Sequence, residues 1–284
     1  MIVVKSLEEL LKRPFKSPFA LIPTMGNLHD GHINLLEIAR EKKFLPVVSI
    51  FVNPLQFGPN EDLDKYPRTL EEDLRILEAN NCHGVFIPRE NEILKNIESL
   101  SAPFANKLCG KSRPGHFDGV ISIVNKLFQV TSPQACVFGL KDFQQQLIIR
   151  HLIKSKQYEI EFLTAPTARD DNGLALSSRN NYLSRKERKE ASKVFKFISD
   201  IQNEIKLSFN AEKKILSVDL DLIHDNYVQI IEENGFEIDY LEFLDSKTLE
   251  SCQNHSTTIL IAIAVFFKQV RLIDNLVIDL SSFS

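Results

Sequence analysis

Long hydrophobic runs are missing from this 284-residue sequence. The most apolar segment, residues 259–267, is nine residues long, whereas a membrane-spanning helix needs roughly 20. We therefore predict no membrane partner and interpret this segment as a buried strand. No signal-peptide pattern precedes Val3, so we expect a cytoplasmic protein.

An excess of positive charge is also missing. The 34 basic and 38 acidic residues give a formal net charge of -4, which provides no electrostatic reason to bind a nucleic acid. The four cysteines, Cys82, Cys109, Cys136 and Cys252, have no metal-ligand spacing. We therefore predict no metal site built from protein ligands, and free thiols in a reduced compartment.

The composition that is present is ordinary for a globular protein, 43% hydrophobic and 25% charged. Up to about residue 180, strand patterns alternate with helical ones, which predicts an α/β fold with a Rossmann-like, doubly wound parallel sheet. The predicted strands are residues 19–22, 46–52, 84–88, 135–138 and 159–165. The predicted helices are residues 6–11, 33–39, 69–79, 118–130 and one that carries residues 144–146.

The pattern changes after residue 184. Two helical stretches, residues 185–207 and 218–234, precede three strand-like runs, residues 238–244, 257–267 and 270–278. Helices followed by consecutive strands indicate a second, smaller α+β domain. We therefore predict a catalytic domain over residues 1–180 and a small C-terminal domain over residues 181–284.

Residues 23–32, Pro-Thr-Met-Gly-Asn-Leu-His-Asp-Gly-His, join a predicted strand to a predicted helix. Gly26 and Gly31 permit a tight turn, and the unpaired N–H groups at the helix start favour a bound phosphate. His29 and His32 are three residues apart, so both imidazoles project from one face and can donate hydrogen bonds to a polyphosphate. The alternative is that one histidine caps a turn while the other packs. The strand–loop–helix context favours phosphate binding.

Two further segments place cations near predicted strand ends or loops. Lys141 follows a strand and Gly139, where it can reach a phosphate; the alternative is a solvated surface charge. Residues 177–179, Ser-Ser-Arg, add hydroxyl donors and a permanent cation.

Residues 53–68 contain three prolines and no periodicity, which predicts a long loop of the kind that carries binding residues.

Together these motifs resemble the pantoate–β-alanine ligase family of the nucleotidyltransferase superfamily, whose signature is His-x-Gly-His. The resemblance covers nearly the whole chain, and the matching segments are residues 23–32, 50–57, 62–68, 112–117, 139, 141–145, 176–180 and 271–275. It implies condensation of (R)-pantoate with β-alanine at the expense of ATP, through a pantoyl adenylate. Diphosphate would leave first and AMP second.

The resemblance also implies the site residues. ATP-binding positions would be Met25, Gly26, Asn27, Leu28, His29, Asp30, Gly31, His32, Gly139, Leu140, Lys141, Asp142, Ala168, Leu176, Ser177, Ser178 and Arg179. Catalytic positions would be His32, the implied proton donor, with His29, Lys141, Ser177 and Arg179. Substrate-binding positions would be Gln56, Gln145 and Asn53. A neutral amide can orient the pantoate carboxylate without cancelling the charge that makes it nucleophilic.

Cofactor and assembly follow from the same resemblance. It implies Mg²⁺ bound with the polyphosphate, a homodimer, and a C-terminal domain that closes as a lid to exclude water. Glu72 and Asp73 are possible Mg²⁺ helpers, but we expect both to be solvated surface acids.

Many family members have Glu at the positions of Leu140 and Cys109. We expect Cys109 to be a packing residue and activity to be retained.

Two other functions fit the sequence less well. An adenylyltransferase acting on a phosphorylated acceptor is disfavoured because Gln56 and Gln145 are neutral, and a phosphate acceptor calls for cations. A nucleotide sensor without catalytic activity is disfavoured because all five implied catalytic residues are present: His29, His32, Lys141, Ser177 and Arg179.

Overall fold

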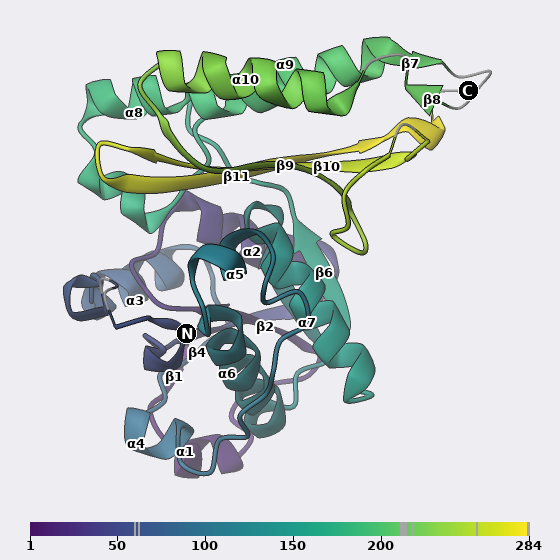
Figure 1. Ribbon diagram of the computed structural model, residues 1–284. Coiled ribbons are helices and arrows are strands. Elements are labelled where there is room, and N and C mark those ends of the chain that lie inside the picture. The colour runs from purple at the N-terminus through teal and green to yellow at the C-terminus, as the bar shows by residue number, and fades with distance from the viewer. Residues whose placement is uncertain (60, 62, 211–214, 217–218, 254, 283–284) are drawn as a thin grey trace. The chain divides into compact units, whose positions relative to one another are not determined.

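The computed structural model describes residues 1–59, 61, 63–210, 215–216, 219–253 and 255–282. The chain forms two compact units (Figure 1). The N-terminal unit contains residues 1–106 and 113–167, and the C-terminal unit contains residues 107–112 and 168–284. The boundary expected near residue 180 falls inside the C-terminal unit. Val218, where the second C-terminal helix was predicted to start, lies outside the described residues.

A six-stranded parallel sheet forms the centre of the N-terminal unit. Its order is β1 (Ile2–Val4), β4 (Gly84–Phe86), β3 (Leu45–Ile50), β2 (Phe19–Thr24), β5 (Ala135–Gly139) and β6 (Glu161–Ala165). Leu21 and Ile22 in the central strand β2 are completely buried, as expected of a strand covered on both faces. The predicted Rossmann-like parallel sheet is therefore confirmed.

The helices of this unit are α1 (Leu7–Leu11), α2 (Asp30–Glu41), α3 (Leu70–Ala79), α4 (Glu90–Ile93), α6 (His116–Thr131) and α7 (Phe143–Ser155). The chain steps from β2 to β3 and β4 on one side, then returns to β5 and β6 on the other. Right-handed crossovers consequently place α2 and α3 on one face of the sheet and α6 and α7 on the opposite face. In such sheets, ligands bind outside the carboxyl ends of the strands where the order reverses. Here that point lies between β2 and β5.

The edge strand β1 was not predicted. It pairs with β4 over three residues, from Ile2 opposite Gly84 to Val4 opposite Phe86. Three residues are too few to show a periodic pattern, so only the following helix, capped by the Ser6 side chain, could be recognised in this part of the sequence.

The C-terminal unit is built on an antiparallel sheet of β9 (Glu237–Asp245), β10 (Thr258–Phe267) and β11 (Val270–Asp279), in the order β11-β10-β9. The long helices α9 (Lys193–Ser208) and α10 (Leu220–Glu233) lie along one face of this sheet (Figure 1). The unit also contains α5 (Leu108–Ser112), α8 (Arg185–Ala191) and a short pair, β7 (Phe209–Asn210) and β8 (Ile215–Leu216). The prediction of a smaller α+β part is confirmed.

The helical stretch predicted over residues 185–207 is present as two helices. The helix is interrupted at Ser192, which separates α8 from α9. The Ser192 hydroxyl donates to the carbonyl of Lys189, 2.8 Å away, and a serine that bonds to nearby backbone in this way competes with regular helix geometry.

Candidate active site

The loop after β2 is held by a buried carboxylate. Gly26 (φ 79°) and Asn27 (φ 51°) are both left-handed. The carboxylate of Asp73 on α3 accepts hydrogen bonds from the N–H groups of Asn27 (3.0 Å) and Leu28 (2.8 Å). A Cβ atom at Gly26 would lie 2.9 Å from an Asp73 oxygen. Gly26 is therefore required both by its backbone angle and by this close approach.

Asp73 was expected to be a solvated surface acid, and this was wrong. The residue is only 1% exposed, and its carboxylate also accepts from the Thr69 hydroxyl at 3.2 Å. The sequence did contain a signal, because Asp73 lies three residues after Leu70 and four before Leu77, on the apolar side of its helix. Glu72, in contrast, is exposed and pairs with Arg75.

His29 and His32 form the start of α2 together. His29 is the N-cap, and its Nδ1 accepts from the Gly31 N–H at 3.1 Å; Nδ1 of His32 accepts from the His29 N–H at 3.2 Å. The two ring centroids are 4.1 Å apart. Because both Nδ1 atoms accept, the proton of each neutral ring lies on Nε2. The turn-capping alternative and the phosphate-binding prediction are thus compatible: Nδ1 caps the helix while Nε2–H remains a donor.

Both rings are neutral at physiological pH. Burial, followed by the nearby Lys141 cation, lowers the pKa of His29 to about 4. Burial, His29 and Lys141 lower the pKa of His32 well below its ordinary value. The pair therefore offers two neutral hydrogen-bond donors next to a cation.

Lys141 follows the carboxyl end of β5. It belongs to the turn η3 (Leu140–Asp142), directly after Gly139, and its side chain is 20% exposed. Its ammonium lies 3.7 Å from the Asp142 carboxylate. Its positive charge is close enough to lower the pKa of both His29 and His32.

Asn53 and Gln56 follow β3, the neighbour of β2. Asn53 is 2% exposed, and its Nδ2 donates to the Gln56 side-chain oxygen and to the Gly119 carbonyl, both at 3.1 Å. This arrangement uses the oxygen of the Gln56 amide. The Nε2 protons are consequently the part of Gln56 that a carboxylate ligand can use.

The three consecutive glutamines at the start of α7 differ in environment. Gln144 and Gln146 are buried, and their amides donate to the carbonyls of Phe104 and Phe138. Gln145 is half-buried, which leaves it as the glutamine of this run with the most access to solvent.

The remaining predicted residues lie in the C-terminal unit. The Leu176 N–H donates to the Ala168 carbonyl at 2.9 Å, which closes the loop that leads to Ser177, Ser178 and Arg179. Ser177 caps the turn η4 (Ser178–Tyr182), with its hydroxyl accepting from the Arg179 N–H.

The base of that loop is fixed by an ion pair that sequence reasoning missed. The Arg169 guanidinium binds the Asp274 carboxylate in two places, at 2.5 and 2.9 Å, and lies 3.6 Å over the Phe195 ring. Asp274 is 4% exposed. A bidentate pair of this kind fixes orientation as well as position.

Cys109 is buried but also makes polar contacts. Its Sγ lies 3.2 Å from the Tyr240 hydroxyl and 3.5 Å from both terminal nitrogens of Arg271. Arg271 in turn binds Asp239. The thiol thus occupies a place beside a cation, within the C-terminal unit.

Among the described residues, no group of three or more His, Cys, Asp or Glu side chains could hold a metal ion. In the same residues, no helix is both long and apolar enough to span a bilayer.

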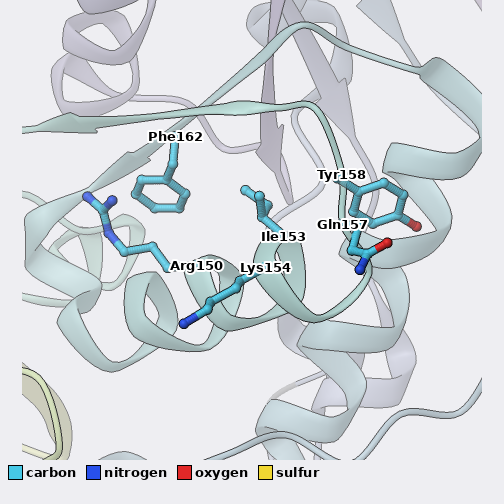
Figure 2. Close-up of a pocket in the computed structure, with 6 residues that line it drawn as sticks. All are labelled: Arg150, Ile153, Lys154, Gln157, Tyr158 and Phe162. Atoms are coloured by element: carbon cyan, nitrogen blue, oxygen red, sulfur yellow. The ribbon is translucent and has the colours of Figure 1, made fainter.

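A separate open hollow of about 380 Å³ lies beside α7 (Figure 2). It is lined by Arg150, Ile153, Lys154, Gln157, Tyr158 and Phe162, none of which is a predicted site residue.

Known proteins are similar to this chain over nearly its whole length. The family model described as pantoate-beta-alanine ligase matches residues 3–277. The pantothenate synthetase of Thermosipho melanesiensis is 38% identical over 98% of this chain and 99% of its own length. That of Acetivibrio thermocellus is 42% identical over 91% of each chain.

Solved structures give the same result. The crystal structure of pantothenate synthetase from Thermus thermophilus superposes with a TM-score of 0.86, at 33% identity, over 97% of this chain and 99% of that one. The pantoate-beta-alanine ligase of Francisella tularensis, complexed with beta-gamma ATP and beta-alanine, has a TM-score of 0.74 at 31% identity, over 97% of both chains.

Proposed function

This chain belongs to the pantoate-beta-alanine ligase family, and on that basis we propose a role for each group at its active site. It is an ATP-dependent ligase that forms a C–N bond between pantoate and β-alanine. The observation that supports our assignment of roles is the pair of neutral imidazoles beside Lys141, at the carboxyl end of the central strands.

The reaction proceeds in two steps in this proposal. The pantoate carboxylate, oriented by the amides of Gln56 and Gln145, attacks the α-phosphorus of ATP, and diphosphate leaves. The β-alanine amine then attacks the acyl carbon of the resulting adenylate, and AMP leaves. His29 and His32 donate Nε2–H to the phosphates while Lys141 balances the charge that grows on the leaving group. Asn53 acts by orienting Gln56.

Magnesium enters as part of the substrate, MgATP. Mg²⁺ keeps several waters and is usually held by phosphates with one or two carboxylates, so it needs no cluster of protein ligands. Asp73 is unsuited to this task because its two oxygens already accept hydrogen bonds from Asn27, Leu28 and Thr69.

The C-terminal unit supplies the second phosphate loop in our proposal. The backbone at Ala168 and Leu176, with Ser177, Ser178 and Arg179, contributes further donors to ATP, and the unit acts as a lid that protects the adenylate from water. The family resemblance also supports a cytoplasmic homodimer.

Release of AMP tests this assignment. Purified protein with MgATP should release AMP steadily only when pantoate and β-alanine are both present. His32→Ala should reduce kcat by roughly two to three powers of ten, because it removes one preorganised donor. Glu72→Ala, at an exposed residue of α3, is the control and should match the wild type. Full activity in folded His32→Ala would contradict the role given to this histidine.

A further inference from the structure

We propose that His116 is a positioning residue that holds Gln56 in place for pantoate through the Gln56 main chain. The inference rests on the substrate-binding role proposed above for Gln56. His116 is the first residue of α6 and is 8% exposed. Its Nδ1 lies 2.8 Å from the Gln56 carbonyl oxygen.

The hydrogen-bond pattern fixes the proton on this ring. Nε2 of His116 lies 3.0 Å from a terminal nitrogen of Arg113. A guanidinium can only donate, so Nε2 accepts and the ring proton must lie on Nδ1. Nδ1–H therefore donates to the Gln56 carbonyl, and the imidazole links Arg113 to Gln56 in one defined orientation.

Arg113 is itself fixed by a carboxylate. Its Nε lies 2.8 Å from one Glu61 oxygen and a terminal nitrogen lies 2.5 Å from the other. The two side chains are only 18% and 24% exposed, so this ion pair is shielded from water far better than a surface pair. A chain of contacts thus runs from Glu61 through Arg113 and His116 to Gln56.

The charge state of His116 suits this arrangement. Burial and then the Arg113 cation lower the pKa of His116 to about 4, against smaller opposing effects of the Gln56 carbonyl, Glu61 and Asp142. The ring is neutral at physiological pH, with one accepting and one donating nitrogen. Protonation would place a second cation against Arg113.

Gln56 is thereby held at two points. His116 binds its carbonyl, and Asn53 binds its side-chain oxygen while also donating to the Gly119 carbonyl of α6. Both contacts connect the turn η1 (Pro54–Gln56) to the start of α6. If the carbonyl contact is lost, η1 gains rotational freedom, and the Gln56 Nε2 donors no longer point in one direction.

Steady-state kinetics of His116 variants test the inference. His116→Phe keeps the ring volume but removes the donor, and it should raise KM for pantoate roughly ten- to a hundredfold. KM for ATP should not change. His116→Asn keeps a donor near the Nδ1 position and should restore most of the loss. A role in folding alone would lower the amount of active protein, and hence apparent kcat, with both KM values unchanged; that result would overturn the proposal.

A double variant identifies the residue through which His116 acts. In a Gln56→Ala background, His116→Phe should cause no further rise in KM for pantoate. A further rise of the same size would overturn the positioning role while leaving that of Gln56 intact. An unchanged KM in Gln56→Ala alone would instead remove the role of Gln56, and this inference with it. If circular dichroism shows that His116→Phe does not fold, His116→Gln serves the same purpose, because its amide reaches the Nε2 position without a donor at Nδ1.

Discussion

Three histidines in the N-terminal unit, His29, His32 and His116, are neutral because they are buried near cations. In each ring one nitrogen accepts a hydrogen bond, from a backbone N–H in His29 and His32 and from the Arg113 guanidinium in His116, so the ring proton is fixed on the other nitrogen. A neutral ring with a fixed tautomer can serve as a directed donor at pH 7. The same burial makes these residues sensitive to acid.

The stability of the protein should therefore fall between pH 6.5 and 4. The pKa of His116 is lowered from 6.5 to about 4 in the folded protein, so in this range the unfolded chain binds a proton that the folded chain does not. The contribution of His116 is complete above pH 6.5 and is lost, by about 1.4 kcal/mol per pH unit, as the pH falls toward 4.

Urea unfolding at several pH values measures this effect, followed by circular dichroism because the chain has no tryptophan. His116→Asn should flatten the decline of the unfolding free energy by about 1.4 kcal/mol per pH unit below pH 6.5. His151→Asn, at an exposed residue of α7, is the matched control. Its free energy of unfolding should depend on pH in the same way as that of the wild type. Identical profiles for all three proteins would show that His116 is not buried as a neutral ring.

At the scale of elements, the start of α6 and the turn η1 approach each other at Gly119. A Cβ atom at this position would lie 2.2 Å from the Leu55 carbonyl oxygen and 2.6 Å from the Gln56 nitrogen. Since the clash is with backbone, no side-chain rotation can relieve it. Only glycine permits the spacing that allows His116 and Asn53 to reach Gln56.

Gly119→Ala should therefore destabilise the protein, although alanine ordinarily stabilises a helix by about 1 kcal/mol relative to glycine. Forcing α6 away from η1 should cost about 1 to 3 kcal/mol of stability and raise KM for pantoate by displacing Gln56. Gly58→Ala is the matched control, because its new Cβ would meet Glu61 at an ordinary 3.8 Å. Denaturant titration and steady-state kinetics of the two variants provide the comparison; equal behaviour would mean that η1 shifts freely.

The sequence predicted these elements well where periodicity extends over several residues. The buried strands β2, β3 and β5 and the helices α3 and α6 lie close to their predicted bounds, and the His29–His32 face was predicted from the spacing alone. What could not be predicted depends on contacts between distant residues. The hydrogen bonds of Asp73 to the loop after β2 and the contact of His116 with Gln56 arise only when α3 and α6 pack against loops after β2 and β3.

At the scale of the whole molecule, the chain passes between its two compact units three times, after residues 106, 112 and 167. The short helix α5 therefore belongs to the C-terminal unit although its neighbours in sequence belong to the other. The contacts that hold it there include Cys109 with Arg271 and Lys107 with Glu250. We propose that both units contribute residues to one ATP site, so that nucleotide binding couples them.

Hydrogen exchange measured by mass spectrometry, with and without MgATP, tests this coupling. A ligand at a hundred times its Kd stabilises the residues that bind it by about 2.7 kcal/mol. Saturating MgATP should therefore slow amide exchange both in residues 26–32 and in residues 168–179. Ser177→Ala combined with Arg179→Met should weaken the protection of residues 168–179. Residues 26–32 should still be protected at a higher nucleotide concentration, because His29, His32 and Lys141 are unchanged. Protection confined to residues 26–32 in the wild type would show that Ala168 and Leu176 to Arg179 have no part in binding ATP.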